Sequence, residues 1–336
     1  MKSKRGPIRV LCGVLAVLLA AVTLMGIAAR LLPSGLSTLP YVPIIVASTP
    51  WFALSAAVAL LLALIGRRTL TAVMMVLCLL LQIYWQAPFF TGAFAKSENQ
   101  SGSSSVASSD SGTASMRVMT CNVYKGKADA EQIVALVRDQ GVRVLALQET
   151  TADFLDRLES AGIAKYLPYS KTASADGVYG NGIWSATPLT NPVKDEVFSS
   201  ASQMPAGTVS VESTSLRFVS VHTTSPVPGY WKQWGRSLDE LAAMQQKSGS
   251  RYVFMGDFNA TYDHALFREF LGTRFTDAAR QAGRGLTFTW PSDRAGVPDA
   301  YAIDHVVLDE NMKASDLQVL KVAGSDHAAL LVTIRA

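Results

Sequence analysis

The segment YVFMGDFNA, Tyr252 to Ala260, ends an apolar run with two side chains that can bind a cation or a phosphate. Asp257 and Asn259 are two residues apart, so they lie on the same side of an extended chain. Gly, Asp and Asn are also the usual residues of turns, and this stretch alone does not separate a turn from a site. The other strand ends of the chain help to decide.

Polar side chains recur at the ends of predicted strands. In chain order they are Asn122, Glu149, His222, Asp257 with Asn259, Asp304, and then Asp326 with His327 before the last strand. Polar residues gathered at strand ends are the usual way in which a rigid sheet presents a site. Carboxylate and amide oxygens bind hard divalent cations, which neutralise phosphate oxygens during ester hydrolysis. Glu149 and Asn122 supply such oxygens.

Six motifs follow one another in a characteristic order: MTCNVY, LALQET, VHTTSP, MGDFNA, AIDHVVL and GSDHAAL. Together they resemble the endonuclease/exonuclease/phosphatase superfamily, which includes pancreatic deoxyribonuclease, AP endonucleases, inositol-polyphosphate 5-phosphatases and bacterial sphingomyelinases. The resemblance covers essentially all of residues 116–336. It implies an α/β fold, a four-layer sandwich of two packed mixed β-sheets flanked by helices. It also implies Mg²⁺-dependent hydrolysis of a phosphate ester, with Mn²⁺ able to substitute.

The resemblance also implies which residues hold the metal and the substrate. Glu149 matches the principal metal ligand, Asn122 a further ligand, and Asp326 a residue near the metal. Within GDFN, Asp257 is expected to orient or activate the attacking water, and Asn259 to hold a phosphate oxygen. Gly256 is expected to let the backbone pass close to a ligand, and Phe258 to pack in the core.

Two histidines match catalytic positions of the family. His327 is expected to contact the scissile phosphate as an acid or base, with its ring held by the carboxylate of Asp304. His222 matches a second histidine that can protonate the leaving oxygen.

Three further polar residues have weaker assignments. Asn181 in GNGIWS is expected to face the substrate, although turn chemistry explains it almost as well. His305 is interpreted as structural, and His264 as a surface or loop residue.

The predicted strands alternate with helices, in the segment DAEQIVALVRDQG (129–141) and over 230–246 and 265–271, which favours α/β layering. The N-terminal third is different. It contains three apolar segments, about 10–30, 42–65 and 69–90, which carry no charge apart from Arg30 at the end of the first, and each is about as long as the ~20 residues that span a bilayer. Residues 1–94 are therefore predicted to be a membrane region with three transmembrane helices. Two alternatives remain: a cleaved signal peptide for the first segment, and a buried hairpin for the other two.

The basic residues near these segments predict their orientation. Lys2, Lys4, Arg5 and Arg9 precede the first segment, Arg67 and Arg68 lie between the second and third, and only Arg30 lies between the first and second. By the positive-inside rule, the N-terminus is cytoplasmic. With three crossings, the catalytic domain would then be extracytoplasmic, in a multi-pass protein of the cell membrane.

A Ser-rich segment, 95–115, separates the two parts, with nine serines in residues 97–115. Such a composition favours a flexible linker with a root-mean-square reach of roughly 25 Å. Residues 1–115 carry a net charge of +6 and residues 116–336 a net charge of −2, so the expected catalytic domain is not basic. The cysteines Cys12, Cys78 and Cys121 indicate no disulfide framework.

Three functions are compatible with these observations. The first is a membrane-anchored phosphodiesterase or phosphatase acting on a lipid-linked or envelope-linked ester. The second is an extracellular endonuclease acting on DNA or RNA, although a protein that grips long nucleic acids usually carries a basic face. The third is an inactive binding module. No protein partner is inferred from the sequence.

Overall fold

The computed structural model describes residues 6–91, 115–212, 214–294 and 296–336. The chain forms two units, Met1–Pro88 with Asp263–Ala265, and Phe89–Tyr262 with Leu266–Ala336. We describe each unit by itself. The linker expected at 95–115 lies outside the described residues except for Ser115.

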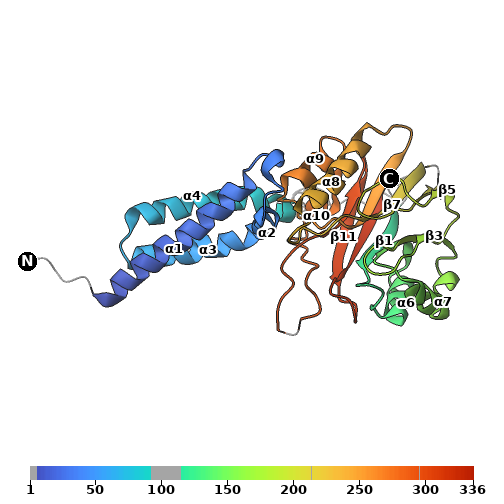
Figure 1. The fold of residues 1–336 in the computed structure, drawn as a ribbon, viewed down its shortest axis with the longest axis horizontal. Coiled ribbons are helices and arrows are strands. Elements are labelled where there is room, and N and C mark those ends of the chain that lie inside the picture. The colour runs from blue at the N-terminus through green and yellow to red at the C-terminus, as the bar shows by residue number, and fades with distance from the viewer. Residues whose placement is uncertain (1–5, 92–114, 213, 295) are drawn as a thin grey trace, which may run out of the picture. The chain divides into compact units, whose positions relative to one another are not determined.

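The first unit is helical. Its helices are α1 (Pro7–Arg30), α2 (Val42–Ala47), α3 (Thr49–Ile65) and α4 (Thr69–Gln86), with a short 3₁₀ turn at Ser34–Leu36 (Figure 1). Within the described residues, two helices, α1 and α4, are long and apolar enough to cross a membrane. Two of the three expected membrane helices therefore meet this test.

The segment 42–65 does not form the single long helix that was expected. It divides at Ser48 into α2 and α3, and α3 has only 17 residues. Pro50 lies in the first turn of α3, and a proline has no N–H to donate to the carbonyl of Val46. The helix therefore restarts there, and the three-helix anchor is not confirmed.

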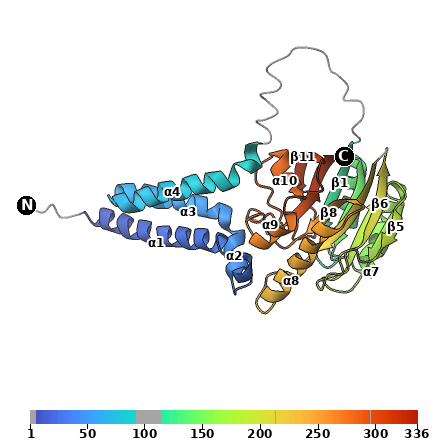
Figure 2. The same cartoon turned by 90° about the horizontal axis from the view of Figure 1, so that it is seen from above.

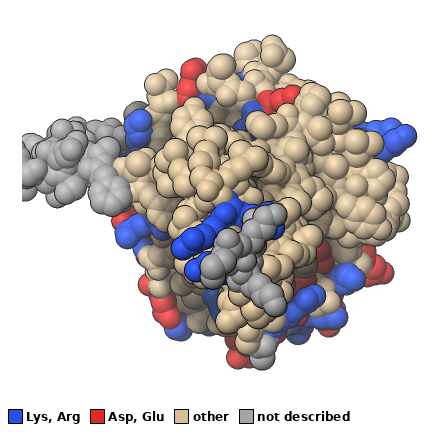
Figure 3. All heavy atoms as spheres, turned by 90° about the vertical axis from the view of Figure 1, so that its left-hand side faces the viewer, with Lys and Arg blue, Asp and Glu red and all other residues tan. Residues whose placement is uncertain are grey.

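Charged residues are sparse in this unit and lie at helix ends. Arg67 and Arg68 are exposed in the turn between α3 and α4. Figure 3 views the molecule from the side at which α1 begins, where Lys and Arg atoms gather near the middle of a largely uncharged face.

The second unit contains two six-stranded sheets. The first has the order β11-β12-β1-β2-β4-β3 and the second β5-β6-β7-β8-β10-β9. The strands of the first sheet are β1 (Ser115–Asn122), β2 (Val142–Gln148), β3 (Tyr169–Ala173), β4 (Asn181–Ser185), β11 (Lys313–Leu320) and β12 (Ala329–Arg335). Those of the second are β5 (Thr190–Val193), β6 (Ala206–Val211), β7 (Thr214–His222), β8 (Arg251–Asp257), β9 (Thr276–Asp277) and β10 (Asp304–Leu308). Both sheets are mixed, because β1–β2 and β7–β8 are parallel pairs.

The side chains that alternate along the strands build the layers. In β1, Val118 packs into the core between the sheets, whereas Met119 and Cys121 pack on the outer side under helices. That outer layer is α6 (Ala130–Asp139) and α7 (Ala152–Ser160). On the other sheet, α8 (Trp231–Ala242) and α9 (Ala265–Leu271) cover a third core, and α10 (Ala278–Ala282) joins the central one (Figures 1 and 2). The expected sandwich of two packed mixed sheets flanked by helices is confirmed.

The strand registers bring the polar strand ends to one edge of the sandwich. Asn122 at the end of β1 pairs with Gln148 at the end of β2, the residue before Glu149. In the second sheet, Asp257 pairs with His222 on one side and with Asp304 on the other.

Candidate active site

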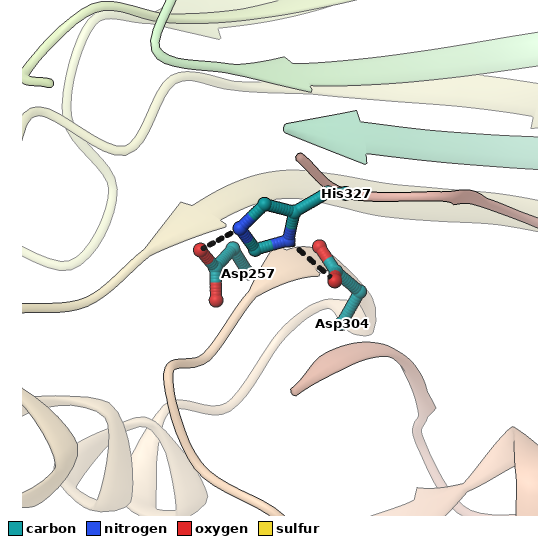
Figure 4. Close-up of side chains that lie close together, drawn as sticks. All are labelled: Asp257, Asp304 and His327. Carbon is teal, nitrogen blue, oxygen red and sulfur yellow. Dashed lines mark hydrogen bonds and ion pairs between the residues drawn. The ribbon is translucent and has the colours of Figure 1, made fainter. Parts of the chain in front are cut away.

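The ring of His327 lies between two aspartates (Figure 4). Its Nδ1 is 2.8 Å from Oδ2 of Asp304, and its Nε2 is 3.7 Å from Oδ2 of Asp257. All three side chains are buried, at 5%, 1% and 1% exposure respectively. An imidazole held at one nitrogen by a carboxylate has a fixed orientation, which leaves the other nitrogen to face a reactant.

The charge of this cluster is set by its carboxylates. Burial by itself lowers the pKa of His327, but Asp304 and Asp257 outweigh it and raise the pKa to about 10. His327 is therefore an imidazolium at neutral pH. Burial raises the pKa of Asp257, and the two histidine rings partly oppose that shift. The donor atoms of these three residues lie within 4.8 Å of one another, close enough to hold a metal ion together.

Glu149 and Asn122 lie beside this cluster. The amide Nδ2 of Asn122 donates to Oε1 of Glu149 at 3.2 Å and to Oδ2 of Asp257 at 3.1 Å. Its oxygen, Oδ1, accepts from the backbone N–H of Tyr124 at 2.9 Å. Asn122 therefore directs its N–H groups at the two carboxylates and holds those carboxylates in place. Its side-chain oxygen faces the backbone of Tyr124 instead.

Glu149 adopts a left-handed backbone conformation (φ 60°), a conformation that carries strain in a non-glycine residue. Its Oε2 accepts the backbone N–H of Lys125 at 2.8 Å, and its side chain is 9% exposed. Burial raises the pKa of Glu149, while the hydrogen bonds from Asn122 and Lys125 oppose that shift.

His222 is the last of the polar side chains that gather around Asp257. Its Nε2 lies 3.7 Å from Oδ2 of Asp257 and 3.9 Å from Oε1 of Glu149. Burial lowers the pKa of His222, so its ring is neutral at pH 7 while that of His327 is charged. One oxygen of Asp257 thus lies 3.7 Å from each of two histidines in different protonation states.

Asn259 is held at the end of β8 by the neighbouring loop. Its Nδ2 donates to the carbonyl of Thr223 at 3.0 Å, and its Oδ1 accepts from Ser225 at 3.0 Å. Its backbone N–H donates to Oδ1 of Asp257 at 2.8 Å, and its carbonyl accepts Nε1 of Trp234 at 2.9 Å. Asp257 and Asn259 are thus linked directly by a hydrogen bond, although Asn259 has a left-handed backbone (φ 45°) and does not continue the extended chain.

The role expected for Gly256 is corrected. Its close neighbour is the adjacent strand and not a ligand position, because a Cβ there would overlap the carbonyl oxygen of Val221 in β7. Its φ of 153° also lies outside the usual range of L-residues. Phe258 is fully buried as expected, with its ring against Phe267 and Phe270.

Asn181 does not reach the surface. It is fully buried at the start of β4, where Nδ2 donates to the carbonyl of Ser220 at 3.1 Å and Oδ1 accepts its hydroxyl at 2.5 Å. Because Ser220 belongs to the other sheet, Asn181 ties the two sheets together, and both its amide nitrogen and its amide oxygen are engaged in this contact. His305 is buried, with Nε2 2.9 Å from the carbonyl of Ala260 and Nδ1 3.5 Å from Asp277. His264 is also buried rather than exposed, among the buried residues Thr261, Asp263 and Leu266.

Two supporting residues, Ser325 and Trp290, were not among the expected site residues. The hydroxyl of Ser325 donates to the carbonyl of Asn122 at 2.6 Å and accepts the N–H of His327 at 3.0 Å. Trp290 donates to Oδ2 of Asp326 at 3.3 Å. The serine two residues before His327 in GSDH is a sequence signal for the first contact, whereas Trp290 is 36 residues from its partner and carries no local signal.

The donor set at this edge fits a hard divalent cation. Glu149 supplies a partly accessible carboxylate, and Oδ1 of Asp326 is buried without a hydrogen-bond partner among the described residues. The thiol of Cys121 does not compete, because burial raises its pKa and keeps it protonated. Oxygen donors without thiolates are the set that Mg²⁺ and similar cations take.

Comparisons with known proteins agree with this geometry. The model of the Endonuclease/Exonuclease/phosphatase family matches residues 119–327, more than half of the chain. Among curated proteins, no sequence matches. The structure of D. rerio TDP2 complexed with single strand DNA product is 15% identical, with a TM-score of 0.56 over 66% of this chain and 99% of that one.

Two phosphatase structures are similar to the same degree. The mannosyl-6-phosphatase Bt3783 of Bacteroides thetaiotaomicron VPI-5482 is 14% identical, with a TM-score of 0.52 over 65% of this chain and 99% of that one. The 3′ phosphatase NExo from Neisseria, bound to product DNA hairpin, is 18% identical, with a TM-score of 0.51 over 65% and 98%. Identities this low establish the fold alone. With the family match, they lead to one conclusion: the chain belongs to the endonuclease/exonuclease/phosphatase family, and is a phosphoesterase of this metal-dependent class.

Proposed function

We propose that the protein is a membrane-anchored, extracytoplasmic, Mg²⁺-dependent phosphoesterase whose substrate is a lipid-linked or envelope-linked phosphate ester. The observation that carries the catalytic part is the contact of the charged His327 with Asp304, beside Asp257 and Glu149. This arrangement combines an imidazolium, a carboxylate near two histidines, and oxygen donors for a cation.

The chain's own residues have separable roles in this proposal. The imidazolium of His327 binds a non-bridging oxygen of the scissile phosphate, with Asp304 holding the ring. Asp257, held by the N–H groups of Asn259 and Asn122, orients the attacking water and accepts its proton. Asn259 binds a second phosphate oxygen through the amide hydrogen not donated to Thr223.

His222 acts on the side of the leaving group. Its neutral ring gains a proton more easily once a phosphate is bound, because the anion favours the charged form. In that form it donates to the leaving oxygen.

Glu149 and Asp326 are the residues proposed to hold the metal, with Asn122 fixing the carboxylate of Glu149. When bound, a divalent cation of this type neutralises phosphate oxygens and polarises the bond to the leaving group.

Two features support a membrane location. Helices α1 and α4 have the length and composition of membrane spans, and α2–α3 is proposed to complete a third crossing with its interruption at Ser48. The loop after His222 exposes Val227 (46%) and Tyr230 (51%), with the exposed Lys232 and Arg236 beside them. Apolar and aromatic side chains next to cations are typical of residues at a lipid interface.

The second candidate is a tethered nuclease. It is favoured by the fold shared with D. rerio TDP2 and with NExo, whose structures contain DNA products. Against it stands the net charge of −2 for residues 116–336, because duplex binding gains much of its affinity from Lys and Arg. An inactive binding module remains the least supported alternative, since the polar groups needed for catalysis lie together at one edge of the sandwich.

A direct competition tests these alternatives. Purified full-length protein in detergent is given mixed lipid vesicles and supercoiled plasmid together, with Mg²⁺ and then with excess chelator. We expect release of phosphorylated headgroup in Mg²⁺ and none in chelator. Rapid nicking of plasmid without lipid turnover would refute the lipid substrate and support the nuclease, whereas full activity in chelator would exclude the metal.

A further inference from the structure

The loop after β1 has an unusual backbone. Tyr124, Lys125 and Gly126 are consecutive and all have positive φ, at 47°, 54° and 72°. A left-handed conformation is strained for a residue with a Cβ, because the Cβ comes too close to the following carbonyl oxygen. Two such residues in succession persist only where surrounding contacts hold them, and strain of this kind is concentrated at binding and catalytic sites.

The contacts that hold this loop begin at the catalytic carboxylates. The N–H of Tyr124 donates to Asn122 and the N–H of Lys125 donates to Glu149. The backbone of Lys125 is therefore one hydrogen bond away from the proposed metal ligand. This contact places the loop at the rim of the active site.

The loop is also fixed from the side of α7. Arg157 donates to the carbonyls of Gly126 and Ala128, and its Nε is paired with Asp153 at 3.1 Å. A Cβ at Gly126 would collide with Thr151 and Phe154, so the loop lies directly on the start of α7. The loop is held in place before any ligand arrives.

This rigid loop gathers two cations on one ring. The ammonium groups of Lys125 and Lys127 lie 5.8 Å and 4.4 Å from the centre of the Tyr124 ring, and both lysines are exposed. Among the described residues, neither ammonium makes an ion pair. Each ammonium is therefore a charge without a carboxylate partner in the described structure, and the oxygens of a phosphate can supply the missing counter-charge.

A cavity of about 470 Å³ lies next to this pair. Lys127 lines it together with Arg157 and with Gly324, two residues before Asp326. Two acids, Asp129 and Glu131, also line it. Asp129 is used as the N-cap of α6, where it accepts the N–H of Gln132 at 3.0 Å. The cavity therefore has a basic side, formed by Lys127 and Arg157, and an acidic side on which Asp129 is engaged in the helix start.

We propose that Lys125 and Lys127, gathered on Tyr124, form an anion subsite that binds a second phosphate group of the substrate. The inference rests on the proposed function, since the first phosphate is the one bound at His327. The subsite selects substrates with two nearby phosphates, such as polyphosphorylated headgroups, diphosphate-linked lipids or polynucleotides, over isolated monophosphate esters. The two ammonium groups bind the second phosphate as point charges, and each of them contacts the ring of Tyr124.

The test uses two esters that differ by one phosphate. The p-nitrophenyl ester of thymidine 5′-phosphate is compared with the same ester carrying a 3′-phosphate, using full-length protein in detergent with Mg²⁺. We expect a KM for the bisphosphate that is roughly tenfold lower, the effect of about one charge-assisted hydrogen bond. In the double variant Lys125→Gln/Lys127→Gln, the ratio of the two KM values should fall toward one.

A charge-matched control separates the subsite from general electrostatics. Lys247→Gln/Lys313→Gln removes two exposed lysines before β8 and at the start of β11, and should leave the KM ratio unchanged. An equal KM for both esters in the wild type, or an equal loss of preference in the control, would overturn the subsite.

Calorimetric binding of thymidine 5′-phosphate and thymidine 3′,5′-bisphosphate decides the question independently of turnover. If neither ester is hydrolysed but the bisphosphate binds more tightly through these lysines, the proposed function fails and the subsite stands. Vesicles containing phosphatidylinositol 4-phosphate then test whether the same lysines favour a membrane-borne second phosphate.

Discussion

Nδ1 of His327 lies 2.8 Å from Oδ2 of Asp304, although the two residues belong to different sheets. Asp304 begins β10 in the second sheet, and His327 precedes β12 in the first. The contact is therefore made only when the two sheets are packed in their native register. It couples the protonation state of the catalytic ring to the packing of the sandwich.

Replacing Asp304 with Asn should shift the alkaline limit of activity. The pKa of His327 is raised to about 10 although burial lowers it, and Asp304 is the largest cause of the increase. Without that carboxylate, the ring loses its proton at a lower pH. The pH profile of kcat/KM should therefore fall on its alkaline side at a lower pH in Asp304→Asn than in the wild type. An unchanged alkaline limb would show that His327 does not act as an imidazolium.

Single substitutions of the proposed catalytic groups should abolish turnover without unfolding the protein. Glu149→Ala, Asp257→Ala and His327→Ala are each expected to lower kcat at least ~10²-fold, as the loss of one acid–base or charge-stabilising group does. The hydrolysis of a chromogenic phosphodiester, followed beside circular dichroism, measures both effects. Asp316→Asn, at an exposed residue of β11, is the matched control and should retain full activity.

The His305–Asp277 pair should make stability depend on pH. Burial lowers the pKa of His305, but Asp277 outweighs it and the pKa in the folded protein is raised above 6.5. The contribution of the protonated ring is therefore complete below about pH 6.5, its ordinary value, and is lost as the pH rises through the raised value.

The free energy of unfolding of wild type and His305→Gln, measured in denaturant, checks this. The difference between them should be larger at pH 6 than at pH 9. A difference that grows with pH would reverse the assigned sign, and in Asp277→Asn the pH dependence should weaken.

Gly256→Ala should destabilise the second sheet. The new methyl group would overlap the carbonyl of Val221 across the parallel pair β7–β8, and the backbone would be strained at φ 153°. Overpacking of this kind costs about 1–3 kcal/mol. Gly249→Ala shares the positive φ (86°) but meets open space, so the thermal melting point should drop more in Gly256→Ala. An equal decrease of the melting point in both variants would mean that the structure relieves the clash without losing stability.

The membrane topology can be tested with fusions at Ala336. A reporter active only outside the cytoplasm should be active there, because the basic residues flanking the apolar segments favour a cytoplasmic N-terminus. Activity of a cytoplasmic reporter at the same position would instead support an even number of crossings, as the two helices α1 and α4 alone would give.

The sequence was sufficient to predict the strands and helices that have strong hydropathy patterns. The long apolar strands, including β1, β2, β7, β8 and β12, were predicted, and α9 has the predicted bounds. Short or polar strands such as β3, β5 and β9 were not identified, because their positions depend on pairing with neighbours rather than on their own composition. The break at Ser48 was missed because hydropathy alone ignores the effect of Pro50 on the helix.

The candidate site could be predicted to the level of residue types, but not of atoms. His327, Asp304, Asp257 and Glu149 lie together as their order implied, whereas the amide of Asn122 is turned so that its N–H groups face the carboxylates. Side-chain orientation depends on partners far away in sequence, such as the backbone of Tyr124 for Asn122. Asn181 shows the same limit, since its partner Ser220 belongs to the other sheet.

The pairing of β1 with β12 has a consequence for biosynthesis. Ser115 pairs with Arg335, so β1, which already has β2 on one edge, gains its second neighbour only when β12 has been made. His327 directly precedes β12, so its contact with Asp304 also waits for this last part of the chain. On the proposed mechanism, a growing chain that already contains Glu149 and His222 has no activity. We therefore expect no hydrolysis of phosphate esters by a ribosome-bound chain until β12 has been made.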